Sequence, residues 1–305
     1  FFFAYRLNRP VQQLIQSADI IAKGDLKHRV DIRSGDEFEL LGKSFNSMIE
    51  SVNQYLVNTL YRERVSKELE LAAKIQNDLL PKENPRINGF DFAFGLLPAP
   101  EIGGDIYDFL NLSENRFVTY IADVTGHGIP ATFGNAVAGA IFASYIQKFD
   151  PLQSLIATNK ILKSRIPGNI FITLGLLFWD GQKMFHLNAG HELLLHFHAS
   201  EKKITASTRN GVPLGTIPDI SSQLQYEEIN LCPGDVLLLY SDGVSSAWKN
   251  EKENYGIARL KRAFTEYSSL PTALAVRNAL LADVKEFMGS YKQTDDMTVV
   301  IIKKQ

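Results

Sequence analysis

The hydrophobic pattern of this chain changes its period at Leu80-Pro81, and this change constrains the fold more than any other feature. Before it, apolar residues recur every three or four positions, which is the period of amphipathic helices. After it, short β-branched and aromatic runs alternate with Gly, Pro and Asn, which is typical of strands and turns. A chain of 305 residues has room for two domains. We therefore expect an all-α segment followed by an α+β domain.

The composition excludes several classes of protein. Hydrophobic residues make up 45% and charged residues 22%, which are ordinary globular values. The formal net charge of −2 argues against a nucleic-acid partner, because nucleic-acid binders carry a basic excess. The single cysteine, Cys232, excludes an intramolecular disulfide and any cysteine-cluster metal site. A reducing compartment fits this cysteine usage.

The first residues are strongly apolar and are followed by basic ones. Phe1–Tyr5 precedes Arg6 and Arg9, but a bilayer span takes about 20 apolar positions. We expect residues 1–7 to be the end of a transmembrane helix that begins upstream of Phe1. Lys and Arg beside such a helix favour the cytoplasmic side, which predicts this chain on the cytoplasmic side of the cytoplasmic membrane. The alternative is a short, buried hydrophobic end.

Helices dominate the chain as far as Arg86. Pro10 suits the first position of a helix that should end at Gly24-Asp25, and an extended connector over Leu26–Arg33 follows. The next helix should begin near Asp36, where cap-like and acidic residues gather. Its apolar residues form a coiled-coil seam: Leu41, Phe45, Met48, Val52 and Tyr55. A second seam follows after a phase break: Val65, Leu69, Ala72, Gln76 and Leu79.

These features resemble a HAMP signalling domain. The resemblance rests on Pro10, Gly24-Asp25, the connector, Asp36-Glu37 and the segment Phe45-Asn46-Ser47-Met48. It implies a HAMP domain over residues 8–58, a coiled-coil linker helix over 59–86, and a parallel homodimer that passes on a signal from a membrane sensor. A plain dimerising coiled coil is the alternative, and both interpretations predict a dimer.

Residues 87–305 are expected to form the second domain. The predicted strands are Asp91–Leu97, Phe117–Ala122, Phe171–Phe178, Lys183–Asn188, Glu192–Phe197, Gln223–Ile229, Val236–Tyr240 and Met297–Ile302. The predicted helices are Pro130–Phe149, Pro151–Arg165, Gly256–Tyr267 and Pro271–Tyr291. Strands come in runs with the helices grouped between them, which favours α+β over a parallel βαβ sheet.

Four short acidic motifs stand out in this domain. Asp123 and Asp242 each end an apolar strand, and Asp295 precedes one. Converging carboxylates repel one another unless they hold cations, and hard divalent ions such as Mg²⁺ or Mn²⁺ prefer oxygen ligands. A lone Asp-Gly is more often a simple turn, but the set predicts a site for about two metal ions. The motifs are Gly103-Gly104-Asp105-Ile106-Tyr107-Asp108, Asp123-Val124-Thr125-Gly126-His127-Gly128, Ser241-Asp242-Gly243 and Asp295-Asp296-Met297-Thr298.

The first motif shares Gly-Gly-Asp with the diguanylate cyclases, but these need Glu-Phe next, where Ile106-Tyr107 stands. Together the motifs resemble PP2C-type serine/threonine phosphatases of the bacterial SpoIIE/RsbU-like branch, from about Val65 to Ile302. Many members carry Glu where Ser246 stands, but that Glu is not a metal ligand. Other matching segments are Ala72–Pro81, Pro98-Ala99-Pro100, Asn188-Ala189-Gly190-His191, Gly211-Val212-Pro213-Leu214-Gly215 and Gly234-Asp235.

The resemblance implies an antiparallel β-sandwich flanked by helices, with the metals at one end. Asp123 would bridge two Mn²⁺ or Mg²⁺ ions, and the Val124 main-chain carbonyl would bind one of them. Asp242 and Asp295 would bind the other ion, and Asp105 would complete the cluster. Asp296 and Asp108 are weaker candidates: Asp296 would be a further metal ligand, or each of the two would only orient its neighbour. His127 would be a general acid, and His191 would be structural.

The resemblance also implies the function. The reaction would be metal-assisted hydrolysis of phosphoserine or phosphothreonine, without a phosphoenzyme. The expected substrate and partner is a phosphorylated anti-sigma-factor antagonist in a partner-switching pathway, and the HAMP and linker helices would regulate the enzyme. The alternative is a catalytically silent receptor domain that binds a phosphoprotein. Retention of Asp105, Asp123, Asp242 and Asp295 together weighs against that alternative.

Overall fold

A computed structural model describes residues 2–99, 103–126, 129–148, 150–165 and 170–305. Two compact units make up the chain, residues 1–68 and residues 69–305. Helix α2 runs from the first unit into the beginning of the second.

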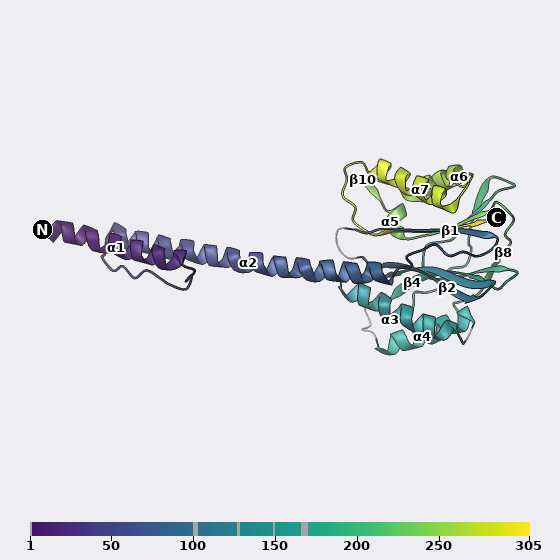
Figure 1. Cartoon of the computed structure of the whole chain (residues 1–305), viewed down its shortest axis with the longest axis horizontal. Coiled ribbons are helices and arrows are strands. Elements are labelled where there is room, and N and C mark those ends of the chain that lie inside the picture. The colour runs from purple at the N-terminus through teal and green to yellow at the C-terminus, as the bar shows by residue number, and fades with distance from the viewer. Residues whose placement is uncertain (1, 100–102, 127–128, 149, 166–169) are drawn as a thin grey trace. The chain divides into compact units, whose positions relative to one another are not determined.

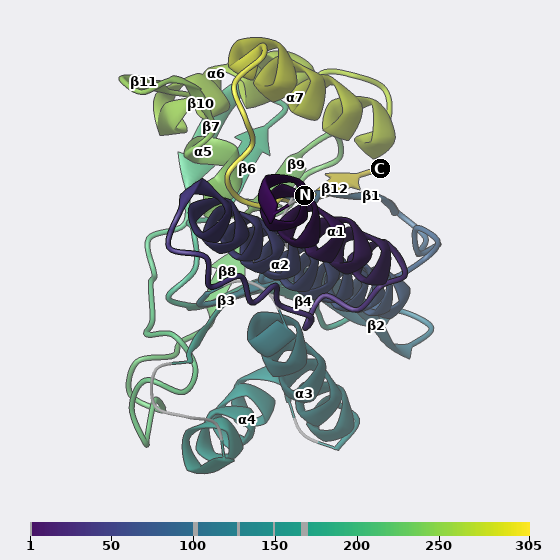
Figure 2. The same cartoon turned by 90° about the vertical axis from the view of Figure 1, so that its left-hand side faces the viewer.

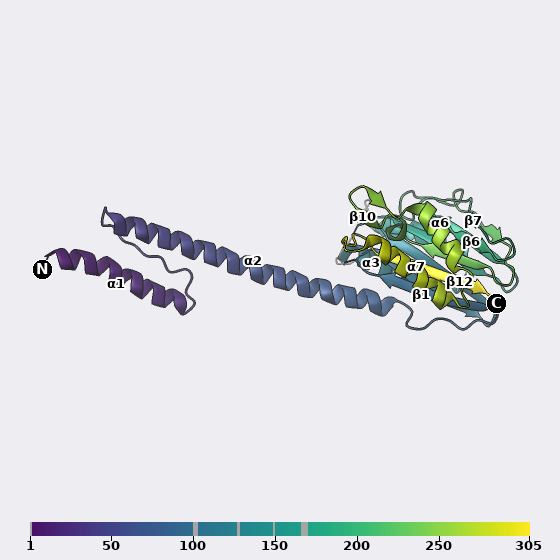
Figure 3. The ribbon, with the colours of Figure 1, turned by 90° about the horizontal axis from the view of Figure 1, so that it is seen from above.

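The first unit holds two helices that run in the same direction (Figure 3). Helix α1 spans Phe2–Ala22, and α2 spans Glu37–Leu79. The prediction that Pro10 begins the first helix was wrong, because the helix already starts at Phe2 and Pro10 lies inside it. Proline removes one N–H donor but keeps a helical φ, so the preceding turns can continue through it. The start of α2 was predicted, and Asp36 Oδ1 accepts a hydrogen bond from Phe38 N at 3.0 Å.

The Asn46 side chain in α2 holds the connector between α1 and α2 through two hydrogen bonds. Asn46 Nδ2 donates to Val30 O at 2.8 Å, and Asn46 Oδ1 accepts from Val30 N at 2.9 Å. Val30, Ile32 and Ile49 are buried. Across the described residues, no helix is both long enough and apolar enough to span a bilayer. Most of the first predicted seam is exposed on the single chain: Leu41, Met48, Val52 and Tyr55.

The second unit contains two five-stranded antiparallel sheets. The first sheet has the order β1 (Phe90–Leu97), β12 (Met297–Lys304), β9 (Val236–Tyr240), β6 (Leu195–His198) and β7 (Lys203–Ala206). The second has the order β2 (Asp105–Ser113), β3 (Arg116–Val124), β4 (Ile172–Trp179), β5 (Met184–Ala189) and β8 (Glu227–Ile229). A hairpin pairs β10 (Trp248–Asn250) with β11 (Glu253–Asn254).

Helices cover the outer faces of both sheets (Figures 1 and 2). Helices α6 (Gly256–Tyr267) and α7 (Ala273–Met288) lie over the first sheet, and α3 (Ile129–Ile146) and α4 (Pro151–Arg165) lie over the second. Aromatic side chains fill the space between the sheets, where the Phe92 and Phe117 ring centroids are 5.2 Å apart. Burial of this apolar surface holds the layers together. The predicted fold class, a helical N-terminal region and an α+β sandwich flanked by helices, is confirmed.

Two expected strands begin three or four residues later than predicted. The strand predicted at Glu192–Phe197 lies at Leu195–His198, and the one predicted at Gln223–Ile229 is shortened to Glu227–Ile229. Strands β2, β7, β10 and β11 and the short helix α5 (Asp242–Ser245) were not predicted. Strand β2 is hard to recognise from its sequence, because the polar residues Asp108 and Asn111 interrupt the apolar alternation.

Candidate metal centre

Four strand ends bring acidic residues to one end of the sandwich. Asp105 begins β2 and lies directly opposite Asp123, the penultimate residue of β3. Asp242 follows β9 and Asp295 precedes β12, and these two strands are neighbours in the other sheet. The sheets are joined here because Thr298 Oγ1 in β12 donates a hydrogen bond to Asp105 Oδ2 at 2.5 Å. The structure therefore places the four carboxylates that the sequence singled out at the same end of the sandwich.

Asp296 is buried and holds the turn before β2. Its Oδ1 accepts a hydrogen bond from Ala99 N at 2.8 Å, and its Oδ2 accepts one from Asp105 N at 3.4 Å. A Cβ atom added to Gly103 would lie 1.7 Å from Asp296 Oδ2, so this approach requires glycine. Both carboxylate oxygens of Asp296 are thus engaged by the main chain. This geometry favours the orienting role for Asp296 over a metal-ligand role.

The Val124 carbonyl and the Asp123 carboxylate face the same glycine. A Cβ atom added to Gly104 would lie 2.3 Å from Val124 O and 2.6 Å from Asp123 Oδ1. Val124 N in turn donates to Gly104 O at 3.2 Å. The two oxygens are therefore close together on one side of the turn, as expected if both bound one ion. Glycine keeps this space open because any side chain would fill it.

Burial and mutual repulsion raise the pKa values of three carboxylates in the cluster, Asp105, Asp123 and Asp242. Burial, followed by the charges of Asp242, Asp295 and Asp296, raises the pKa of Asp123 to about 7. Burial and the charge of Asp123 raise the pKa of Asp105 well above its usual range. The pKa of Asp242 is also raised, first by burial and then by the charge of Asp295. Each carboxylate thus resists ionisation in the absence of a compensating cation.

The donor set fits a hard divalent cation. It consists of carboxylate oxygens and one carbonyl oxygen, which Mg²⁺ and Mn²⁺ prefer over the nitrogen and sulfur ligands of softer metals. The repulsion between Asp105, Asp123 and Asp242 would be relieved by such a cation. The residues that would hold it are Asp105, Asp123, the Val124 carbonyl, Asp242 and Asp295.

Two weaker candidates have different outcomes. Asp108 lies three residues after Asp105 and therefore on the other face of β2, where it forms a hydrogen bond with Tyr120. Its Oδ1 also accepts from Phe109 N at 2.7 Å, so the structure does not bring Asp108 to the acidic cluster. His127, the predicted general acid, lies outside the described residues.

Gln76 was missed as a site residue. Its buried side chain, near the end of α2, donates from Nε2 to Asp105 O at 2.9 Å and to Gly103 O at 3.3 Å. The sequence placed Gln76 on an apolar helical seam, and a polar residue at such a position was the available signal. The contact itself could not be predicted, because the partners are 27 and 29 residues apart in the chain.

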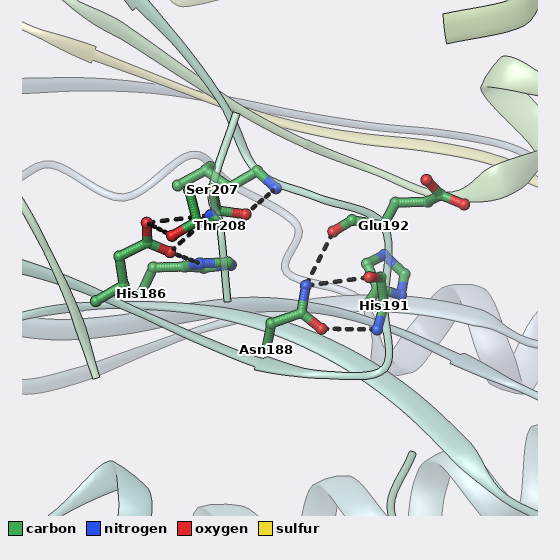
Figure 4. A network of polar contacts seen from close by, with 8 residues as sticks. His186, Asn188, His191, Glu192, Ser207 and Thr208 are labelled. Atoms are coloured by element: carbon green, nitrogen blue, oxygen red, sulfur yellow. Dashed lines mark hydrogen bonds and ion pairs between the residues drawn. The ribbon is translucent and has the colours of Figure 1, made fainter. Parts of the chain in front are cut away.

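His191 joins the two sheets behind the acidic cluster. Its Nδ1 lies 2.8 Å from Thr173 Oγ1 in β4, and its Nε2 lies 3.1 Å from Tyr240 O at the end of β9. Asn188 holds the adjoining main chain, with its Oδ1 accepting from His191 N at 2.8 Å (Figure 4). Burial lowers the pKa of His191 to about 4, so the ring is neutral near pH 7. These contacts agree with the structural role that was predicted for His191.

Comparisons with known proteins agree with this architecture. The sequence model described as Stage II sporulation protein E (SpoIIE) matches residues 113–305, and the HAMP domain model matches residues 2–54. The chain is 25% identical to Protein IcfG of Synechocystis sp. (strain ATCC 27184 / PCC 6803 / Kazusa), covering 96% of this chain and 51% of that protein. It is 25% identical to Phosphoserine phosphatase RsbU of Bacillus subtilis (strain 168), covering 80% of this chain and 72% of that protein. The chain thus spans only about half the length of IcfG.

Solved structures show the same fold. The SiaA PP2C domain of Pseudomonas aeruginosa matches with a TM-score of 0.69 at 19% identity, over 81% of this chain and 98% of that one. The PP2C phosphatase domain of Bacillus subtilis SpoIIE, with a fragment of its regulatory domain, matches with a TM-score of 0.57 at 21% identity. That match covers 70% of this chain and 63% of the other. The chain belongs to the SpoIIE family of PP2C-type phosphatases and carries a HAMP domain before the phosphatase fold.

Proposed function

We propose that residues 87–305 form a Mn²⁺- or Mg²⁺-dependent phosphatase that hydrolyses phosphoserine or phosphothreonine in a protein substrate. The observation that carries this proposal is the convergence of Asp105, Asp123, Asp242 and Asp295 at one end of the sandwich. Family membership and the similarity to a phosphoserine phosphatase, RsbU, support the reaction class.

The chain's own residues shape this site. Bound divalent ions would neutralise phosphoryl oxygens and lower the pKa of water. Asp123 interacts with the acidic residues of both sheets. It pairs with Asp105 in its own sheet, and the charges of Asp242 and Asp295 from the other sheet raise its pKa. Thr298 orients Asp105 through its hydroxyl, and Asp296 fixes the preceding glycine turn through the main chain. The carboxylates are therefore held in place from outside the cluster before any ion binds.

Metal-dependent phosphate release tests the reaction class. The whole chain is incubated with p-nitrophenyl phosphate in Mn²⁺, in Mg²⁺ or in chelator. We expect turnover with metal, and a loss of at least about 100-fold in Asp123→Asn, more than changes to outer-sphere partners usually cost. Asp219→Asn, at an exposed position, is the matched control and should keep full activity. A chain that neither turns over phosphoesters nor binds Mn²⁺ in calorimetry would instead be a silent receptor domain.

The proposed substrate is a phosphorylated anti-sigma-factor antagonist. This substrate follows from the SpoIIE/RsbU-like branch that the motifs resemble. The test compares phosphate release from such an antagonist with release from unrelated phosphoserine peptides under the same metal conditions. Efficient hydrolysis of the unrelated peptides with none of the antagonist would reject the substrate while leaving the reaction class intact.

The first unit is proposed to form a parallel homodimer and to tether the enzyme to the cytoplasmic face of a membrane. The HAMP match and the exposed seam residues Leu41, Met48, Val52 and Tyr55 support the dimer. A charge on the seam should prevent association, so Val52→Glu should sediment as a monomer in analytical ultracentrifugation. Gln54→Glu, at an exposed position outside the seam, is the matched control. A dimer of unchanged affinity in Val52→Glu would reject the seam as the interface.

The end of α2 is proposed to transmit the regulatory signal to the acidic cluster. Gln76 supports this, because it bonds to the main chain of Gly103 and Asp105. Ser66→Pro should break α2 and uncouple activity from the HAMP domain. Gln76→Ala should change the metal concentration needed for half-maximal activity, whereas the exposed Gln54→Ala should not. Unchanged activity and dimerisation in Ser66→Pro would contradict the coupling.

A further inference from the structure

A second cluster of side chains of the kinds that bind metals lies at the opposite end of the sandwich. Asp235 directly precedes β9, whereas Asp242 of the acidic cluster follows that strand. At about 3.3 Å of rise per extended residue, the two positions are on the order of 20 Å apart. Whatever Asp235 binds is therefore separate from the acidic cluster.

Strand β6 supplies two histidines to this second cluster. His196 and His198 are two residues apart in the strand, so both side chains lie on the same face of the sheet. Their rings are in contact, with centroids 3.8 Å apart. His196 Nε2 is 3.0 Å from Asp235 Oδ2, and one ligand atom from each of the three residues lies within 4.8 Å of the other two. Two nitrogen donors and one oxygen donor thus converge, although Asp235 comes from a different part of the chain.

The main chain holds Asp235 in place independently of the histidines. Its Oδ1 accepts a hydrogen bond from Ala199 N at 2.8 Å, and its Oδ2 accepts one from Cys232 N at 3.0 Å. Lys304 N donates to Asp235 O at 2.9 Å, which ties this turn to the end of β12 near the C-terminus (Figure 3). Gly234 has a φ of 89°, a conformation that glycine adopts without strain. The carboxylate is therefore already placed where the two rings meet it.

We propose that His196, His198 and Asp235 bind one Zn²⁺ ion. Two imidazole nitrogens and a carboxylate oxygen are a typical zinc donor set with a fourth position open to water, whereas Mg²⁺ and Mn²⁺ prefer the all-oxygen cluster. His198 is half-buried, which gives an ion access from solvent, while His196 and Asp235 are buried. The ion would join the β6–β7 hairpin, at the edge of the first sheet, to the turn before β9.

Binding requires one proton to move. The hydrogen bond between His196 Nε2 and Asp235 Oδ2 places a proton on that nitrogen, because an ionised carboxylate only accepts. The ion takes the place of this proton, which shifts to Nδ1, so that the ring stays neutral and binds the ion through Nε2. His198 Nε2 lies 2.8 Å from Thr205 Oγ1, and the Thr205 hydroxyl can serve as donor or acceptor there. No oxidation or reduction is involved.

A metal titration of the whole chain tests this proposal. The protein is stripped with chelator, 10 mM Mg²⁺ is added to occupy the acidic cluster, and Zn²⁺ is titrated by calorimetry, with Co²⁺ absorption in the visible range as a second readout. We expect one Zn²⁺ per chain and visible Co²⁺ bands, with affinity at least 10-fold weaker in His198→Ala. His28→Ala, which removes a histidine from the first unit, is the matched control and should bind as the wild type does.

Two further variants separate the loss of a zinc ligand from misfolding and from zinc binding at the acidic cluster. His198→Gln keeps a polar group beside Thr205, so a folded protein with lost Zn²⁺ affinity separates ligand loss from misfolding. Asp123→Asn should keep the Zn²⁺ site, since its side chain belongs to the acidic cluster. Equal Zn²⁺ affinity in wild type, His198→Ala and His198→Gln would overturn the proposal. Loss of the Zn²⁺ site in Asp123→Asn alone would also overturn it, because the ion would then lie in the acidic cluster.

Discussion

The two ends of the sandwich hold buried or half-buried carboxylates whose pKa values shift in opposite directions. At one end, burial and neighbouring carboxylates raise the pKa values of Asp105 and Asp123. At the other end, burial also acts to raise the pKa of Asp235, but hydrogen bonds from Cys232 N, Ala199 N and the His196 ring outweigh it and lower the pKa. Nearby hydrogen-bond donors therefore decide, more than burial does, whether a carboxylate inside the protein is ionised.

The two ends therefore make different demands on a cation. The carboxylates of the acidic cluster repel one another, so a bound cation would relieve this repulsion. The Asp235 end is already satisfied by hydrogen bonds, so an ion there would exchange with a proton rather than relieve repulsion.

Removal of the Asp235 carboxylate, whose two oxygens both accept hydrogen bonds, should destabilise the fold most. Asp235→Ala leaves the Cys232 and Ala199 N–H groups without their acceptor, and it also removes the His196 contact. We expect the free energy of unfolding to fall by about 3 kcal/mol in urea denaturation. Glu201→Ala, at an exposed position between β6 and β7, should stay within about 0.5 kcal/mol of the wild type. Equal stability of the two variants would mean that these hydrogen bonds contribute little.

Addition of a divalent ion should stabilise the acidic end almost as strongly. A ligand that binds the folded state at 100 times its Kd adds about 2.7 kcal/mol to the free energy of unfolding. We expect Mn²⁺ to produce a gain of this order in wild type and much less in Asp123→Asn. Thermal unfolding with and without chelator measures it, with the exposed Asp219→Asn as control. An equal gain in Asp123→Asn would place the stabilising ion elsewhere.

Without metal, an Asp→Asn substitution should raise the free energy of unfolding at the acidic end and lower it at the Asp235 end. Asp123→Asn removes one of the repelling charges, so we expect the metal-free protein to gain about 2 kcal/mol in unfolding free energy at pH 8. Asp235→Asn should lower the free energy of unfolding. The two carboxylate oxygens accept hydrogen bonds from main-chain N–H groups, and an amide NH₂ group in place of one oxygen cannot accept such a bond. Urea denaturation in chelator compares the two variants. A destabilised Asp123→Asn would contradict the repulsion argument.

The pH dependence of the metal-free protein should show the smallest effect. The folded-state pKa of Asp123 is about 7, above its ordinary value of 3.8, so the folded state binds more protons than the unfolded state between these values. The contribution of Asp123 to stability is therefore fully present below about pH 4 and is lost as the pH rises through 7. Between pH 6 and 8 we expect a loss of about 1 kcal/mol in chelator, and a smaller loss in Asp123→Asn. Identical slopes in the two proteins would assign the titration to another group.

Much of the acidic cluster was predictable because each ligand candidate belongs to a short motif. Asp123, Asp242 and Asp295 each stand beside an apolar run, and a strand end can be recognised from neighbouring residues alone. The strand that begins at Asp105 was not predicted, because its polar residues obscure the alternation. The roles of Gln76 and Thr298 were also missed, since their hydrogen bonds join positions 29 and 193 residues apart.

The second cluster was invisible in the sequence for the same reason. His196 and His198 belong to none of the motifs that indicated a site, and Asp235 stood out only as part of the Gly234-Asp235 segment that resembles the phosphatase family. The pairing of β6 with β9 brings Phe197 opposite Val236 and so carries the histidines to the turn at Asp235. A local pattern cannot predict such an antiparallel register between strands far apart in the chain.

The amino-acid sequence by itself determined the division into a helical and an α+β region, the family resemblance and the set of acidic motifs. These features are local, because they depend on hydrophobic period and on residues within a few positions of one another. Tertiary structure alone decided which carboxylates face other carboxylates and which face N–H donors. The physical reason is that burial and hydrogen bonding come from whichever strands become neighbours, so the charge state of a carboxylate is a property of the folded sheet.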